Sequence, residues 1–170
     1  AKQAGNSGKI LDKLFDSCIR IATNIRNSTG IGVGVTSIGD IAVNLAEEKI
    51  GKIGSKKILL IGTGETAAMV AKCLNKKGHT FDVVSMSIER ATGFSKTLGG
   101  TPVNFEDVIG FPKHDLVLVA TTADYFIVSA KDMKKSMKNK KSGIMILDLS
   151  DPRAVELQVG MIPKIKAVFR

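Results

Sequence analysis

The segment at residues 57–67, KILLIGTGETA, constrains the fold of this 170-residue chain more than any other. Its unbroken run of Ile and Leu is typical of a parallel strand that is buried on both faces. After a glycine-rich turn, apolar residues return at helical spacing, at Ala67, Val70, Ala71 and Leu74. The segment therefore predicts a strand, a tight turn and a helix in direct succession.

The turn has the spacing GxGxxA, formed by Gly62, Gly64 and Ala67. In a dinucleotide site of this form, the first glycine permits the turn, the second lets the backbone approach the pyrophosphate, and the third residue is small so that helix and strand pack closely. The helix start also offers unpaired N–H groups to phosphate. Glycines also occur in ordinary strand-to-helix turns. The motif therefore indicates a dinucleotide site only because a predicted strand precedes it and a predicted helix follows it. The candidate phosphate loop comprises Gly62, Thr63, Gly64, Glu65 and Thr66.

Strand and helix patterns alternate through the rest of the chain. Strands are predicted at residues 81–85, 101–103, 115–120 and 143–149, with helices between them that Ser87, Asn104 and Ser129 can cap. This alternation predicts the α/β class, with a doubly wound parallel sheet of the Rossmann type and right-handed crossovers. Such sheets bind ligands beyond the carboxyl ends of their strands. We therefore expect residues 62–66, 85–87, 121–123 and 150–152 to surround one crevice.

Residues 1–54 have the pattern of helices joined by a linker. A first helix is predicted over residues 10–25, with an apolar face of Leu11, Leu14, Phe15, Cys18, Ala22 and Ile25. A second begins at Ser37, whose spacing to Asp40 fits a capping box, and its apolar side comprises Ile38, Ile41, Ala42 and Leu45. We therefore divide the chain into an N-terminal helical extension with its linker, residues 1–54, and a dinucleotide-binding domain, residues 55–170.

The composition argues against a membrane, secreted or metal-binding protein. No apolar run approaches the roughly 20 residues of a membrane span and no signal segment opens the chain, so we expect a soluble, cytoplasmic protein. Cys18 and Cys73 lie on apolar helical stripes without a CxxC or a His/Cys cluster, and we interpret both as small core residues. His79 lies in a predicted turn, and we interpret it as a surface residue rather than a metal ligand.

The net charge of +9 and the pI of about 9.6 allow two interpretations. A basic chain approaches polyanionic partners or phosphorylated cofactors readily. The same balance results from a lysine-rich, well-solvated surface, which we favour. Residues 131–141, KDMKKSMKNKK, hold six lysines in one predicted helix. Met133 and Met137 are four residues apart, so we expect them to pack on the sheet and the lysines to point to water.

The end of the second predicted strand bears on which dinucleotide binds. An NAD site usually carries an acidic residue there, whereas an NADP site has neutral and basic groups. This chain has Ser85, Met86 and Ser87, with Arg90 one turn into the next helix. Hydroxyls and a guanidinium can bind a 2′-phosphate, which favours NADP(H). The alternative is that Ser87 only caps the helix and Arg90 is solvated.

Further stretches stand in order around the glycine turn: IRNSTGI at residues 25–31, the helical segment 35–46, IERA at residues 88–91 and DLSDPR at residues 148–153. In this order the chain resembles the dinucleotide domain of glutamyl-tRNA reductase, with its VRTETGI segment, linker helix, GAGE turn and DIAVPRD segment. The resemblance spans nearly the whole chain. It implies an oxidoreductase that uses NADPH to reduce glutamyl-tRNA to glutamate-1-semialdehyde, in tetrapyrrole and heme biosynthesis.

The resemblance also implies which residues face the nicotinamide. They are Thr121, Thr122 and Ala123 after the fourth strand, and Ser150, Asp151 and Pro152 after the fifth. Ordinary loop capping by short hydroxyl side chains is an equal alternative for Thr121 and Thr122. One departure concerns Met86, because the family commonly has an arginine at this position.

A second departure concerns what the chain lacks. The family's nucleophilic cysteine belongs to an N-terminal catalytic domain, and its dimerising helices follow the dinucleotide domain. We therefore expect a fragment of a longer, homodimeric protein that meets glutamyl-tRNA only through the missing domains and is inactive alone. Neither Cys18 nor Cys73 matches the family nucleophile, so no catalytic residue is assigned.

Two other functions share the glycines and the strands. A regulatory module could sense a nucleotide without chemistry, since fold alone does not determine function. The dinucleotide domain of another oxidoreductase, such as a shikimate dehydrogenase-like enzyme, would have the same pattern. The linker segment and residues 148–153 distinguish the resemblance from both, because neither alternative requires them.

Overall fold

The computed structural model describes residues 8–29 and 37–169. The chain divides into two compact units, Ala1–Val35 and Thr36–Arg170. Within the described residues, no helix is long and apolar enough to cross a membrane. The predicted domain boundary at residues 54 and 55 concerns the organisation of a longer protein and stays a prediction.

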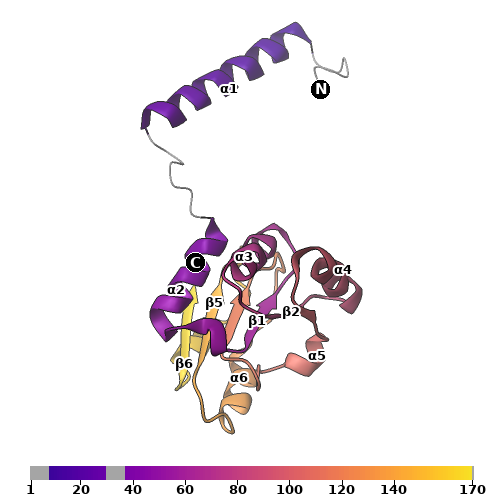
Figure 1. Ribbon diagram of the computed structural model, residues 1–170, viewed down its shortest axis with the longest axis vertical. Helices are drawn as coiled ribbons and strands as arrows, with labels where there is room; N and C mark the ends of the chain where they lie inside the picture. Colours follow the sequence, from indigo (N-terminus) through magenta and orange to yellow (C-terminus); the bar gives the residue numbers. More distant parts are fainter. Residues whose placement is uncertain (1–7, 30–36, 170) are drawn as a thin grey trace. The chain divides into compact units, whose positions relative to one another are not determined.

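The described part of the first unit is one helix, α1 (Lys9–Thr29), which agrees with the predicted helix (Figure 1). None of its residues is buried. Cys18 is exposed, so its prediction as a core residue is wrong for this structure. The physical reason is that, among the described residues, no second element of the same unit covers the apolar face of α1.

The second unit is built on a sheet of six parallel strands in the order β3-β2-β1-β4-β5-β6 (Figure 1). Leu60 in the centre of the sheet is in register with Val83 on one side and Leu118 on the other. The doubly wound parallel sheet is thus confirmed, and β6 is a strand that the sequence analysis missed. The strands are β1 (Ile58–Ile61), β2 (Asp82–Val84), β3 (Thr101–Pro102), β4 (Leu116–Val119), β5 (Ile144–Asp148) and β6 (Ile165–Phe169).

In this unit α2 (Ile38–Ile50) and η1 (Ile53–Ser55) precede β1, and the other helices and the second 3-10 segment lie in the connections between the strands. The elements in the connections are α3 (Glu65–Lys76), α4 (Ile88–Leu98), α5 (Phe105–Val108), α6 (Ala130–Met137) and η2 (Leu157–Met161). Ser37, Ser87 and Ser129 cap α2, α4 and α6 as predicted, and Asn104 precedes α5.

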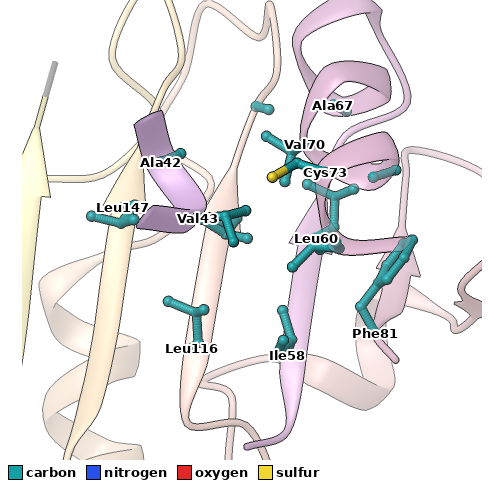
Figure 2. Packing of buried hydrophobic residues seen from close by; sticks show 14 of the residues in the cluster. Ala42, Val43, Ile58, Leu60, Ala67, Val70, Cys73, Phe81, Leu116 and Leu147 are labelled. Atoms are coloured by element: carbon teal, nitrogen blue, oxygen red, sulfur yellow. The ribbon is translucent and has the colours of Figure 1, made fainter. Parts of the chain in front are cut away.

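Alternate residues of each strand face opposite sides of the sheet, which produces two cores. Ile58 and Leu60 join the core with residues of α2, α3 and α4, whereas Leu59 and Ile61 join the core with α6 and η2. Figure 2 shows the first of these, where Val43, Val70 and Cys73 lie over the strands. All four residues of β1 are buried, as expected for a strand covered on both faces.

The buried face of α2 differs from the prediction. Small residues form it, namely Gly39, Ala42, Val43 and Ala46, while Ile41 is 56% exposed. A Cβ atom on Gly39 would lie 2.4 Å from the carbonyl oxygen of Met69 in α3. The two helices thus pack too closely for large side chains, so the predicted apolar side is wrong for Ile41.

Polar side chains hold the other end of α2 on α3. Lys77 Nζ donates to Asn44 Oδ1 at 2.7 Å and to the carboxylate of Glu47, and His79 Nε2 lies 3.2 Å from Glu47 Oε1. The hydrogen bond from Lys77 lowers the pKa of Glu47. The His79 side chain is only 11% exposed, so it is less of a surface residue than predicted.

The lysine-rich helix is shorter than the predicted 131–141, because α6 ends at Met137. Met133 and Met137 are buried, as expected, and Lys131, Lys134 and Lys135 are exposed. Lys140 departs from the expectation. It is buried, and its Nζ donates to the carbonyl oxygens of residues 111, 112 and 114.

Candidate dinucleotide site

A pocket of about 1270 Å³ opens where β1, β2 and β4 end at the carboxyl edge of the sheet. The chain forms β1, β2 and β3 on one side and then returns to form β4 on the other side of β1. The carboxyl ends of β1 and β4 are therefore the switch point, where doubly wound sheets bind ligands. Most of the predicted site residues line the pocket. They are Gly62, Thr63, Gly64, Glu65, Thr66, Ser85, Met86, Arg90, Thr121, Thr122 and Ala123.

Gly62 shapes the turn after β1. Its φ is +116°, and a Cβ atom at this position would lie 2.0 Å from the carbonyl oxygen of Ala120. Its N–H donates to the carbonyl oxygen of Val84 at 2.9 Å. The turn therefore passes so close to the ends of β2 and β4 that only glycine fits.

Gly64 is the N-cap of α3 and has a different role. Its φ is −83°, and among the described residues no atom lies within 4 Å of where its Cβ would be. The other long helices of this unit begin with a serine that accepts from a first-turn N–H, whereas none of the described side chains caps α3. The N–H groups at the start of α3 thus border the pocket, with open space beside Gly64.

The end of β2 contributes Ser85 and Met86 to the pocket. The Ser85 hydroxyl lies 3.1 Å from Thr63 Oγ1, which ties the phosphate loop to this strand. Met86 is 74% exposed, and the phenol of Tyr125 donates to its Sδ at 2.9 Å. Ser87 lies outside the pocket lining, and its hydroxyl accepts from the Arg90 N–H at 3.4 Å as the cap of α4.

Hydrogen bonds join the loops after β4 and β5. The Thr121 N–H donates to Ser150 Oγ at 3.2 Å, and Thr121 Oγ1 accepts from the Ala123 N–H at 3.2 Å. The second bond is the loop capping considered for Thr121. Ser150 lies behind Thr121 and lines a smaller pocket with Asp148, Asp151 and Arg153, while Pro152 lines neither.

Asp148 fixes the loop after β5. Asp148 is 2% exposed, and its carboxylate accepts from the backbone N–H groups of Ser150 at 3.1 Å, Ala154 at 3.0 Å and Val155 at 2.9 Å. Sequence reasoning noted this residue only within a motif. An acidic residue near the end of the apolar run 143–149 was the available signal, since a buried carboxylate needs donors.

Aromatic residues of the pocket were missed by the sequence analysis. Phe105 begins the short helix α5, and Tyr125 and Phe126 follow β4. All three are exposed despite their size, at 36%, 50% and 54%. Nothing periodic marks them, because they lie in connections. Their exposure beside a pocket is typical of a ligand site. No His, Cys, Asp and Glu cluster among the described residues could hold a metal ion.

The strand order, the glycine turn and the position of the pocket define a dinucleotide-binding domain of the Rossmann type. The sequence pattern of the shikimate / quinate 5-dehydrogenase family matches residues 44–168, and the chain belongs to this family. Within it, the chain is homologous to the NADP-binding region of glutamyl-tRNA reductase.

The similarity to glutamyl-tRNA reductases extends along almost the whole chain. It is 47% identical over 167 residues to glutamyl-tRNA reductase from Cenarchaeum symbiosum, covering 98% of this chain and 40% of that protein. The solved glutamyl-tRNA reductase from Methanopyrus kandleri matches with a TM-score of 0.72 and 31% identity, over 99% of this chain and 43% of that one. The chain thus spans about two-fifths of these relatives.

A more distant structure shares the fold. Shikimate dehydrogenase in complex with NADP+ matches with a TM-score of 0.55 and 19% identity, over 78% of this chain and 48% of that one.

Proposed function

We propose that this chain is the NADPH-holding domain of a glutamyl-tRNA reductase. The parent enzyme would reduce glutamyl-tRNA to glutamate-1-semialdehyde for tetrapyrrole synthesis. One observation carries the proposal: in a chain homologous to these enzymes, the start of α3 has neither a capping side chain among the described residues nor an atom beside Gly64, and it borders the pocket. An anion is the ligand that such a helix start binds.

The phosphates would bind at Gly62, Thr63, Gly64, Glu65 and Thr66. The open space beside Gly64 gives the pyrophosphate room against the backbone, and the N–H groups of the first turn of α3 donate to its oxygens. The fit is supported by Ala67, which is fully buried where helix and strand pack closely. The adenosine 2′-phosphate would lie near Ser85, Ser87 and Arg90, since residues 85–87 carry no acidic side chain.

The nicotinamide end would lie at Thr121, Thr122 and Ala123, with Ser150 and Pro152 in the next loop. The bound cofactor supplies a hydride. The protein's part would be to hold the ring in one orientation. The hydrogen bonds from the Thr121 N–H to Ser150 and from the Ser150 N–H to Asp148 support this role, since they tie the two loops to each other and to β5. The acyl group that receives the hydride would be presented by a domain outside this chain.

The alternative oxidoreductase function is less well supported. The pattern of the shikimate / quinate 5-dehydrogenase family begins at residue 44, whereas the Cenarchaeum symbiosum glutamyl-tRNA reductase matches 98% of the chain. The match therefore includes α1 and the segment before α2, which a dinucleotide-binding function alone does not require.

The experiment compares NADPH binding by the wild-type chain and by Gly64→Val, using calorimetry. A valine side chain would occupy the space proposed for the pyrophosphate, so we expect binding to fall by about 100-fold or more. The fold should survive, because φ at Gly64 is ordinary and the Cβ meets open space.

Gly54→Val is the matched control. Gly54 lies outside the pocket, and a Cβ there would make an ordinary contact at 3.8 Å with His79. This variant should bind NADPH like the wild type. Wild-type affinity in a folded Gly64→Val chain would show that the phosphates bind elsewhere.

A further inference from the structure

Two exposed side chains from different loops meet at the mouth of the pocket. Met86 belongs to the connection from β2 to α4, and Tyr125 to the connection from β4 to α6. Both line the pocket, and the Tyr125 phenol donates to Met86 Sδ at 2.9 Å. The Tyr125 hydroxyl is therefore held beside Met86, just after the end of β2. A dinucleotide site recognises the adenosine 2′ substituent at this end of the second strand.

The present partner of this phenol is a poor one. A thioether sulfur is a weak hydrogen-bond acceptor, whereas a phosphate oxygen is charged and accepts strongly. A phosphate near Met86 would displace the sulfur as partner at little loss. The phenol is also half exposed, so it need not give up a buried position to turn.

The serine hydroxyls near this position are already engaged. The Ser85 hydroxyl shares a hydrogen bond with Thr63, and the Ser87 oxygen caps α4. Residues 85–87 include no basic side chain. Of the hydroxyls at this end of the pocket, that of Tyr125 is bonded to the weakest acceptor.

We propose that Tyr125 is a specificity-determining residue, whose phenol donates to the 2′-phosphate of the adenosine ribose. Tyr125 in the β4–α6 connection and Arg90 in α4, which both line the pocket, would then select the phosphorylated dinucleotide together. This inference rests on the proposed NADPH-binding function and deepens it.

The test is calorimetric binding of 2′,5′-ADP and 5′-AMP to the wild-type chain and to Tyr125→Phe. Loss of a hydrogen bond to a charged group should weaken 2′,5′-ADP by about tenfold or more. Binding of 5′-AMP should change by less than about twofold, since the ring that lines the pocket remains. An equal change for both nucleotides, or none, would overturn the inference.

Met86→Leu separates recognition from loop structure. Leucine keeps the apolar bulk and removes the sulfur acceptor, so 2′,5′-ADP should bind Met86→Leu at least as well as the wild type. If the phenol–sulfur bond only orders the loops, Met86→Leu and Tyr125→Phe would weaken both nucleotides alike, and the inference fails. Thermal unfolding checks that both variants are folded.

The outcomes also distinguish this inference from the function on which it rests. A wild-type chain that binds neither NADPH nor 2′,5′-ADP would contradict the proposed function and this inference with it. A wild-type chain that binds both, with an unchanged preference in Tyr125→Phe, would leave the function standing and reject only the role of Tyr125.

Discussion

The two cysteines lie in opposite environments, which gives a prediction for thiol chemistry. Cys73 is 3% exposed, and burial followed by the neighbouring Asp40 carboxylate raises the pKa of its thiol to about 11. Cys18 is exposed on α1. Since only the thiolate reacts, we expect one thiol per native chain to react rapidly with a disulfide reagent at pH 8. In Cys18→Ser the rapid reaction should vanish, and its persistence there would contradict the burial of Cys73.

The same thiol links stability to alkaline pH. Its folded pKa is raised above the usual value of 9.0, so between pH 9 and about 11 the folded chain holds a proton that the unfolded chain releases. The contribution of the Cys73 thiol to the free energy of unfolding is therefore complete below pH 9 and is lost as the pH rises toward 11.

Lys140 is a second residue whose role is structural. Its Nζ is buried and donates to the carbonyl oxygens of Phe111 at 3.2 Å, Pro112 at 3.4 Å and His114. Burial lowers the pKa of this lysine. Lys140→Met would remove the donor to the buried carbonyl oxygen of His114, whereas that of Phe111 still accepts from the His114 N–H. We expect the free energy of unfolding to fall by about 2 kcal/mol. Urea denaturation measures this change.

The neighbouring residue provides the control for Lys140. Lys141 is exposed, and Lys141→Met should change the free energy of unfolding by less than about 0.5 kcal/mol. Equal effects of the two substitutions would mean that the contacts of the Lys140 ammonium group add nothing to stability.

At the scale of elements, strands and caps were predictable, whereas packed faces were less so. The apolar run of β1 and the serines at helix starts act locally, so spacing alone revealed them. The face of α2 depends on how closely α3 approaches Gly39, which spacing does not encode. Strand β6 was not predicted, because Lys166 interrupts its apolar residues and a 3-10 segment precedes it. The sequence therefore shows neither a continuous apolar run nor a preceding helix there.

The candidate site was predictable to a similar degree. The loops after β1, β2 and β4 meet because parallel strands end at one edge, and the pocket lies where this rule predicts. Phe105, Tyr125 and Phe126 could not be assigned, since their positions depend on the paths of irregular connections. Asp148 acts through backbone N–H groups up to seven residues away, a partnership that appears only in the folded loop.

The α6 region bears on whether this chain meets tRNA directly. Its methionines are buried, and Lys134, Lys135 and Lys138 are exposed. Residues 131–141 include neither an arginine nor an aromatic side chain for specific contacts. We expect any tRNA binding to be weak, sensitive to salt and indifferent to tRNA sequence. Filter binding at two salt concentrations measures it. Tight retention of cognate tRNA that survives salt, and is lost when these three lysines become Glu, would contradict this expectation.

At the scale of the whole molecule, the chain corresponds to about two-fifths of a glutamyl-tRNA reductase. The proposed function gives the chain a cofactor site but no nucleophile, because the Cys73 thiol is buried and protonated and Cys18 matches no nucleophile of the glutamyl-tRNA reductase family. We therefore expect the chain alone to show no NADPH oxidation when glutamyl-tRNA is added. Oxidation of NADPH by the purified chain in the presence of glutamyl-tRNA would contradict this expectation.

In the proposed function, the pyrophosphate of NADPH binds between the glycine turn and the start of α3. The most direct measurement is the amide NMR spectrum of the isotopically labelled chain during titration with NADPH. We expect the signals of Gly62, Gly64, Thr66 and Thr121 to shift together and saturate, while those of α1 and α6 stay in place. Saturable shifts confined to other residues, or unchanged glycine signals at millimolar NADPH, would contradict this position of the pyrophosphate.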